Sequence, residues 1–226
     1  MRFLLAAVTL AATVSGAWAT EPKNGVDYLT LKAFAPSRAG IGAKVEVVEF
    51  FMYHCRHCYT LEPLLADWVK KQGDKISFRR VYLAGDPADP QAHAYVTLEA
   101  MGKLDAIHDK IFSAVQVERI PLGEDEALLE FVGRFGVDKA AYGEFFNSFA
   151  VQSRIRRAME LASTYKIRGA PSVVVDGRYM TSPSLTWGAG HSEAQAQHAM
   201  IAVLDALVVK AKSEDGRRAG PVAAAK

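Results

Sequence analysis

The two cysteines of the chain, Cys55 and Cys58, are separated by two residues and flanked by histidines in the segment "YHCRHC". A disulfide between them would close a loop of only four residues. In the chain-entropy model, the stabilisation that a disulfide provides grows with the length of the closed loop, so this bond would stabilise the fold little. We therefore interpret the pair as reactive, with a thiolate and a reversible disulfide as its two chemical forms.

The residues around the pair favour a thiolate at Cys55. The nearly continuous apolar run Val45–Phe51 is typical of a buried strand, and apolar residues recur with helical spacing from Cys55 to about Gln72. Cys55 would then lie at a helix N-terminus, where unpaired N–H groups and the helix dipole lower the pKa of a thiol. Arg56 adds a positive charge and His57 a hydrogen-bond donor. A stabilised thiolate favours the reduced form and makes the disulfide a strong oxidant.

The elements that must position this pair alternate between strands and helices. A second strand is predicted over Ile76–Leu83, which gives strand, helix, strand and therefore parallel strands. Helical periodicity follows from Gln91 to about Ile167. The segment Pro171–Thr181 predicts two strands joined by an Asp-Gly hairpin turn, and a last helix is expected over about 192–210.

Without the helical block, this order of elements is that of an α/β, thioredoxin-like fold (βαβ…ββα). We expect a discontinuous thioredoxin-like domain over 25–85 and 168–210, a helical insertion over 86–167 and a flexible tail over 211–226. Within the insertion, aromatic and aliphatic stripes are interpreted as core rather than as a cofactor site. One such stripe comprises Tyr142, Phe145, Phe146 and Phe149.

The N-terminus has the pattern of a secretory signal peptide. One positive charge at Arg2 precedes an apolar run over 3–14, and Ala17-Trp18-Ala19 predicts cleavage after Ala19. The mature protein is therefore expected to be exported. The 27 basic and 25 acidic residues give a net charge of +2, and loss of Arg2 would leave +1. A charge so near zero gives no reason to expect nucleic acid or an anionic membrane as the main partner.

The segments "EFFMYHCRHCYTLEP" and "KIRGAPSVVVDGRY", together with the helical insertion, resemble the DsbA family of exported thiol:disulfide interchange proteins. The resemblance covers roughly residues 27–209 and implies that the protein oxidises other proteins. By position it implies the following roles: nucleophile for Cys55, buried resolving thiol for Cys58, redox tuning for His57, cis-proline for Pro171 with the substrate-binding Ala170 before it, and buried acid for Glu49.

The sequence departs from the family pattern at three positions. Arg56 stands where the family most often has proline, and Ala170 where valine is common. Phe78 aligns with a lysine that commonly pairs with the buried acid, and Arg79 or Arg80 could replace that lysine. These differences concern the redox potential and the rate more than the class of reaction.

The resemblance also implies cellular partners and a location. The expected substrates are reduced, unfolded exported proteins, and the expected reoxidant is a quinone-linked membrane protein of the DsbB kind. The protein is expected to act in the periplasm as a monomer. Its redox-active group is expected to be the Cys55–Cys58 disulfide, and neither a cofactor nor a metal is expected.

Two other interpretations remain open. The first is a disulfide isomerase or reductase on the same fold. The second is a metal-binding protein that uses the cluster from His54 to Cys58, although four ligands within five residues can hardly surround one ion. His54 is otherwise interpreted as a plain loop residue. Covalent haem is excluded, because Tyr59 rather than histidine follows the second cysteine.

Overall fold

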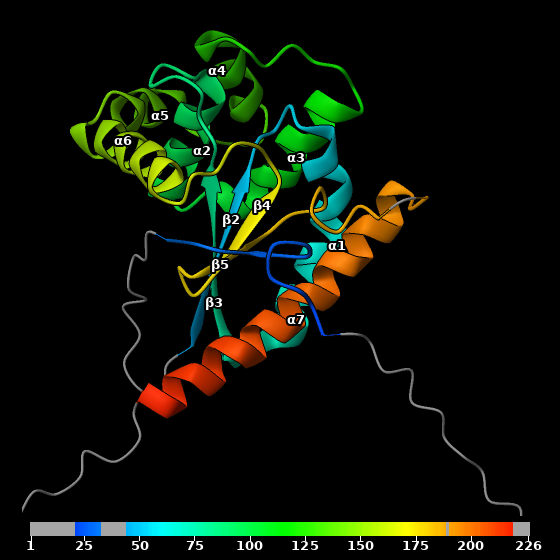
Figure 1. Ribbon diagram of the computed structural model, residues 1–226. Coiled ribbons are helices and arrows are strands. Elements are labelled where there is room, and N and C mark those ends of the chain that lie inside the picture. Colours follow the sequence, from blue (N-terminus) through cyan, green and yellow to red (C-terminus); the bar gives the residue numbers. More distant parts are fainter. Residues whose placement is uncertain (1–20, 33–43, 189, 219–226) are drawn as a thin grey trace, which may run out of the picture.

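The computed structural model describes residues 21–32, 44–188 and 190–218. The expected signal peptide and its cleavage after Ala19 lie outside the described residues. Figure 1 shows a central sheet with two long helices packed along it and a group of shorter helices gathered at one end. That end is where strand β2 (Val45–Phe51) leads into helix α1 (Arg56–Gln72), so the cysteine pair lies between the sheet and the shorter helices.

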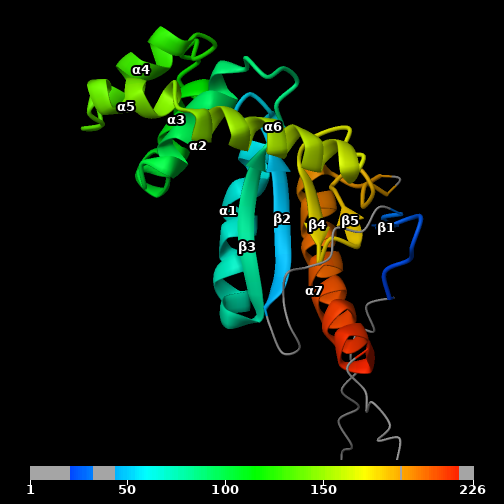
Figure 2. The ribbon, with the colours of Figure 1, turned by 90° about the vertical axis from the view of Figure 1, so that its left-hand side faces the viewer.

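Within the described residues the sheet has five strands in the order β1-β5-β4-β2-β3, which Figure 2 shows side by side. The predicted parallel pairing of β2 with β3 (Ile76–Tyr82) is confirmed, and β4 (Ser172–Val175) and β5 (Tyr179–Thr181) are antiparallel as a hairpin requires. The short strand β1 (Leu29–Thr30), which the sequence did not predict, pairs antiparallel with β5.

The side chains of β2 alternate between two apolar layers, because successive residues of a strand point to opposite faces. Val45 and Val47 pack in one cluster with α1 and α7 (Glu193–Arg218). Val48 and Phe50 pack on the other face, in a cluster that includes the end of the helical insertion. The strand is therefore buried on both sides, which explains its almost continuous apolar sequence.

The hairpin turn between β4 and β5 is formed by Asp176 and Gly177, as predicted. Both residues have positive φ angles, 53° and 63°. Two consecutive positive φ values are the requirement of a type I′ turn, which matches the twist of the strands it joins. Aspartate tolerates this region better than most residues and glycine adopts it freely, so the dipeptide itself specifies the turn.

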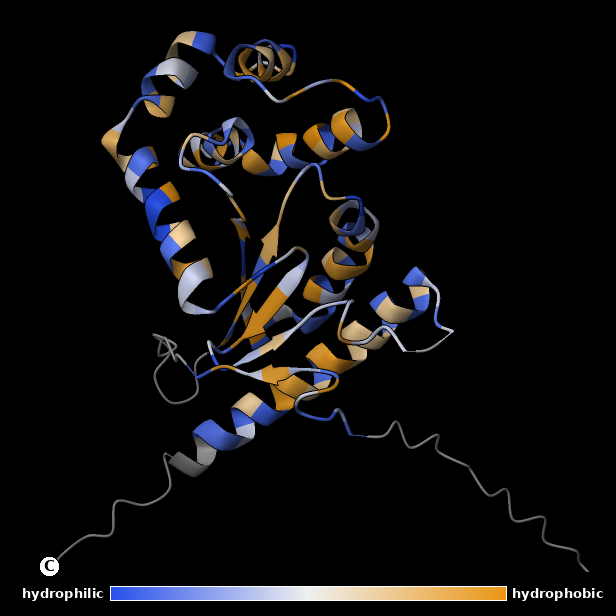
Figure 3. Cartoon of the chain, turned by 45° about the horizontal axis from the view of Figure 1, so that its top comes forward, coloured by the Kyte–Doolittle hydropathy of each residue, from blue (hydrophilic) through white to orange (hydrophobic). Residues whose placement is uncertain are grey.

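The helical insertion lies between β3 and β4 in the chain, as predicted. It consists of α2 (Pro90–Ala100), α3 (Leu104–Gln116), α4 (Asp125–Gly133), α5 (Lys139–Phe146) and α6 (Phe149–Thr164). Its core includes Phe51, Tyr53 and Cys58 at the end of the sheet, so the insertion and the thioredoxin-like part share one apolar cluster. Figure 3 shows hydrophobic residues concentrated in the central strands, and hydrophobic and hydrophilic residues mixed along the helices.

The expectation that the aromatic stripe is entirely core is wrong for two of its four residues. Tyr142 is buried, but Phe145 and Phe149 are 40% and 80% exposed. The stripe belongs to two helices, because α5 ends at Phe146 and the side chain of Ser148 caps α6 by accepting a hydrogen bond from the N–H of Val151. A serine cap starts a new helix axis, so the spacing across it no longer defines one face.

The flexible tail predicted from residue 211 is wrong for its first eight residues. Helix α7 continues to Arg218, and Ala211 is fully buried. The buried guanidinium of Arg178 explains the extension, since it forms ion pairs with Glu214 and Asp215 on the last turns of α7. In the described part of the chain, no helix is both long enough and apolar enough to span a bilayer.

Candidate active site

Cys55 is the N-cap residue of α1, immediately beyond the carboxyl end of β2. Its backbone is extended (φ −81°, ψ 112°), and its sulfur accepts a hydrogen bond from the backbone N–H of Cys58 at 3.3 Å. The side chain is half-buried, and both cysteines are free thiols in this structure. The predicted position at a helix N-terminus is confirmed. It lies at the end of a parallel strand pair, where α/β proteins commonly bind their ligands.

Hydrogen-bond donors around the sulfur lower the pKa of Cys55 to about 6. The largest contribution is the hydrogen bond from the thiol of Cys58; burial opposes it, and the backbone N–H groups of Cys58 and His57 and the charge of the His57 imidazole add to it. A large part of Cys55 is therefore ionised at neutral pH. Arg56 is exposed at the first residue of α1, and its influence on the thiol stays a prediction.

Cys58 has the opposite properties. Its side chain is fully buried in the apolar cluster shared with the insertion. Burial, the hydrogen bond with Cys55 and the negative charge of Cys55 all raise the pKa of the Cys58 thiol far above its usual range. The two thiols are thus strongly asymmetric: one is accessible and acidic, and the other is enclosed and protonated.

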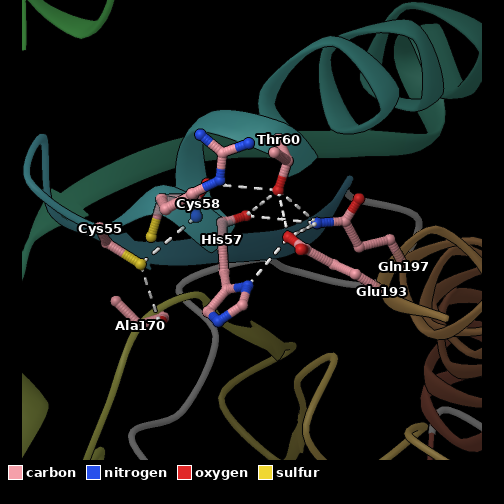
Figure 4. Close-up of polar contacts among 8 residues, drawn as sticks. Cys55, His57, Cys58, Thr60, Ala170, Glu193 and Gln197 are labelled. Carbon is pink, nitrogen blue, oxygen red and sulfur yellow. Dashed lines mark hydrogen bonds and ion pairs between the residues drawn. The ribbon is translucent and has the colours of Figure 1, made fainter. Parts of the chain in front are cut away.

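The loop before β4 lies against the accessible sulfur. The Ala170–Pro171 peptide bond is cis, and the thiol of Cys55 donates a hydrogen bond of 3.3 Å to the carbonyl oxygen of Ala170 (Figure 4). Pro171 is buried, whereas Ala170 is partly exposed. The structure therefore brings together the two segments on which the sequence comparison with the family depends.

His57 belongs to a polar network that the sequence did not predict. Its Nδ1 lies 2.9 Å from Oε1 of Glu193, the first residue of α7, and the same oxygen accepts a hydrogen bond of 2.5 Å from Thr60. Gln197, also on α7, donates to the hydroxyl oxygen of Thr60 at 2.8 Å. Figure 4 shows these side chains converging between the two helices. The sequence gives no sign that the start of α7 meets the first turn of α1, because 136 positions separate His57 from Glu193.

Glu49 is fully buried beneath the pair, and its partner is Arg80. The Nε of Arg80 donates to Oε2 of Glu49 at 3.0 Å, and its Nη2 pairs with Glu62 on α1. Of the two arginines that could replace the family lysine, Arg80 is therefore the one placed to do so. Arg79 pairs instead with Glu46, and the ring of Phe78 lies under the guanidinium of Arg80.

One arginine cannot neutralise two carboxylates, so this buried cluster retains a proton readily. Burial and the nearby charge of Glu62 raise the pKa of Glu49 to about 8, although the charge and the hydrogen bond of Arg80 act in the opposite direction. Desolvation exceeds the attraction of Arg80, because that attraction is shared with Glu62. Glu49 is therefore mostly protonated at neutral pH.

The orientations of the two histidines give no support to a metal site within the cysteine motif. His54 is exposed, and its Nδ1 lies 3.4 Å from Oε1 of Gln91 on α2. The ring of His57 faces Glu193 on α7. In the described ranges, the only group of potential metal ligands within mutual reach lies elsewhere, at Glu62, His108 and Asp109.

Comparisons with known proteins agree with this geometry. Residues 65–199 match the family model of the DsbA-like thioredoxin domain. The chain is 38% identical over 210 residues to the thiol:disulfide interchange protein DsbA of Bordetella parapertussis, a match that covers 92% of this chain and 96% of the relative. It is also 38% identical over 184 residues to the DsbA of Burkholderia cepacia, covering 81% and 86% of the two chains.

Solved structures show the same relationship. The crystal structure of Pseudomonas aeruginosa DsbA superposes with a TM-score of 0.75 at 29% identity, covering 85% of this chain and 95% of that one. DsbA from Xylella fastidiosa gives a TM-score of 0.73 at 28% identity, covering 85% and 98%. These values extend the similarity over both the thioredoxin-like part and the helical insertion.

Proposed function

The chain belongs to the DsbA-like thioredoxin domain family, and on this premise we propose that it is a protein thiol:disulfide oxidoreductase. In this role it donates the Cys55–Cys58 disulfide to reduced, newly exported proteins. The observation that carries the proposal is the asymmetry of the two thiols. An accessible thiol with a pKa of about 6 is largely ionised at neutral pH, and this thiolate stabilises the reduced pair, so the disulfide is readily reduced.

The reaction proceeds in two exchanges. A substrate thiolate attacks the sulfur of Cys55, the Cys55–Cys58 bond breaks, and Cys58 leaves and takes up a proton. The product is a mixed disulfide between the substrate and Cys55. A second substrate thiolate then attacks the substrate sulfur of this bond, and Cys55 leaves as a thiolate. The substrate has lost two electrons and gained a disulfide, and the protein now holds two reduced cysteines.

The surroundings of the pair have supporting roles in this proposal. His57 and Arg56 favour the Cys55 thiolate, and Glu49, which is mostly protonated at neutral pH, affects the redox balance by releasing and taking up its proton beneath the pair. The backbone at Ala170 and Pro171 holds an extended substrate segment beside the sulfur of Cys55, since a partly exposed backbone next to the reacting atom can pair with a peptide strand.

The cellular setting follows from the expected leader and from the chemistry. We place the mature protein in the periplasm as a monomer that needs no cofactor beyond its own disulfide. Each turnover leaves the pair reduced, so a separate oxidant must restore it. We assign this step to a quinone-linked membrane protein of the DsbB kind.

The test is the equilibrium of the Cys55–Cys58 pair against glutathione, combined with transfer to a reduced peptide. We expect the pair to stay reduced against mostly oxidised glutathione, and we expect Cys55→Ser to abolish transfer. With oxidised glutathione, Cys58→Ser should instead accumulate a mixed disulfide between Cys55 and glutathione, because no second thiol is present to displace the glutathione. A pair that is hard to reduce would indicate a reductase or isomerase, and transfer by the Cys55→Ser protein would refute the mechanism.

A further inference from the structure

A second cluster of chemically active side chains lies between α1 and α3, apart from the cysteine pair. Glu62 on α1 and the neighbours His108 and Asp109 on α3 each offer one donor atom, and all three atoms lie within 4.8 Å of one another. The cluster is on the wall of a cavity of about 630 Å³ that is also lined by Arg80, Asp105 and Phe112. Proposed disulfide transfer uses neither His108 nor Asp109.

Two buried atoms of this cluster are placed to bind a ligand. His108 is 95% buried, since its exposed fraction is 5%, and its Nδ1 lies 2.9 Å from the hydroxyl of Tyr53. Its Nε2 and the Oε2 of Glu62 are both buried without a hydrogen-bond partner among the described residues. These two atoms are 3.7 Å apart, too far for a hydrogen bond. Two donors bound tetrahedrally to one zinc ion would be about 3.3 Å apart, given bonds of about 2.05 Å.

We propose that Glu62, His108 and Asp109 bind one divalent transition-metal ion of the zinc class, with the remaining coordination position open to the cavity. The types of donor atom determine which ion is preferred, because imidazole nitrogen favours zinc and its neighbours in the first transition row over calcium or magnesium. Binding at Nε2 leaves the proton on Nδ1, which then donates to the Tyr53 oxygen. A hydrogen bond of this kind orients most metal-bound histidines.

The charges around the site permit a cation. Arg80 is the nearby positive group, but it is engaged by Glu49 and by the other oxygen of Glu62. That pairing holds the carboxylate of Glu62 with Oε2 left for the ion. Asp109 and Asp105 add two negative charges to the cavity wall, and both are exposed.

The proposed ion would lie between the thioredoxin-like part and the helical insertion. Glu62 lies on the helix that carries Cys55 at its N-terminus, whereas His108 and Asp109 lie on the helical insertion. A bound ion therefore joins the thioredoxin-like part to the insertion. Because the site requires both parts to be in place, zinc binds the folded protein preferentially and raises its melting temperature.

Calorimetric titration of the oxidised, untagged mature protein with Zn²⁺ alone tests the proposal. In the oxidised protein both sulfurs are in the disulfide, so thiolates cannot bind the metal. We expect one Zn²⁺ per chain, at least tenfold weaker binding by Asp109→Asn, and binding within twofold of wild type for Asp105→Asn. The two variants remove the same charge from exposed positions of one helix and one cavity wall, so they form a matched pair.

A second measurement identifies the ligand directly. We expect added Zn²⁺ to shift the nuclear magnetic resonances of the His108 ring and to leave those of His54 and His57 unchanged. The proposal is overturned if wild type shows no stoichiometric binding, if both asparagine variants weaken binding equally, or if His54 or His57 responds in place of His108. None of these readouts depends on disulfide exchange.

Discussion

The thiol of Cys55 donates a hydrogen bond of 3.3 Å to the carbonyl oxygen of Ala170, a residue 115 positions later in the chain. Only the protonated sulfur can make this contact, so it favours the thiol. The donors on the opposite side, the thiol and N–H of Cys58 and the N–H of His57, favour the thiolate. These donors outweigh the cost of burial and lower the pKa of Cys55 to about 6.

The ultraviolet absorbance of the thiolate should therefore rise with a midpoint near pH 6 in the reduced protein. Cys55→Ser should abolish this transition, because the pKa of Cys58 lies far above the range of the titration. The same transition should govern the alkylation rate of Cys55. A midpoint near 9, the value of an ordinary cysteine, would show that the donors do not stabilise the thiolate.

The lowered pKa of Cys55 also predicts how the stability of the reduced protein depends on pH. Cys55 ionises at about 6 when folded and near 9 when unfolded, so the unfolded chain binds more protons between these values. The contribution is fully present above about pH 9 and is lost as the pH falls through 6. Denaturant unfolding of the reduced protein minus that of Cys55→Ser should show it. A difference that is flat from pH 6 to 9 would contradict the prediction.

Glu49 should produce the opposite dependence in the oxidised protein, where neither cysteine titrates. Its folded pKa of about 8 lies above the ordinary value of 4.5, so its contribution is fully present below pH 4.5 and is lost as the pH rises through 8. We expect Glu49→Gln to remove a fall in the free energy of unfolding between about pH 4.5 and 8, because glutamine is neutral throughout. The control is Glu46→Gln, a partly exposed residue of the same strand that pairs with Arg79. An equal effect of both substitutions would refute a special role of burial at Glu49.

Glu193 should fix the start of α7 to the first turn of α1. Its carboxylate accepts hydrogen bonds from Thr60 and His57, which lower the pKa of Glu193. We expect Glu193→Ala to cost about 0.5–1 kcal/mol, a small value because the site is near the surface. We also expect the substitution to change the alkylation rate of Cys55, because the charge of the His57 imidazole lowers the pKa of Cys55. Glu144→Ala, at an exposed position on α5, is the control; matching results for the two would exclude a specific contact.

The end of α7 should be necessary for stability. A chain that stops at Lys210 loses buried Ala211 and both Glu214 and Asp215, and it leaves buried Arg178 without its partners on this helix. We expect a loss of about 2–4 kcal/mol in the free energy of unfolding, because removing partners from a buried charge is costly. A chain that stops at Arg218 retains these contacts and is the matched control. Equal stability of the two chains would show that residues 211–218 do not stabilise the fold.

Local sequence determined most of the elements, the hairpin turn and the identity of the reactive residues. The β2 strand, the helix that Cys55 caps and the Asp176–Gly177 turn are specified by patterns within a few residues, because apolar period and backbone preference act at short range. The spacing of Cys55 and Cys58 alone showed that their disulfide is a poor structural link.

Tertiary structure decided which distant groups act on those residues. Whether Arg79 or Arg80 pairs with Glu49, and which residue faces His57, depends on strand register and on how α7 packs against α1. The same holds for the proximity of Glu62 to His108 and for the length of α7, whose last turns form ion pairs with Arg178 in the turn between β4 and β5. Contacts between residues far apart in the chain arise from packing. The periodicity of one segment shows which of its faces is buried, but it does not specify which distant segment packs against that face.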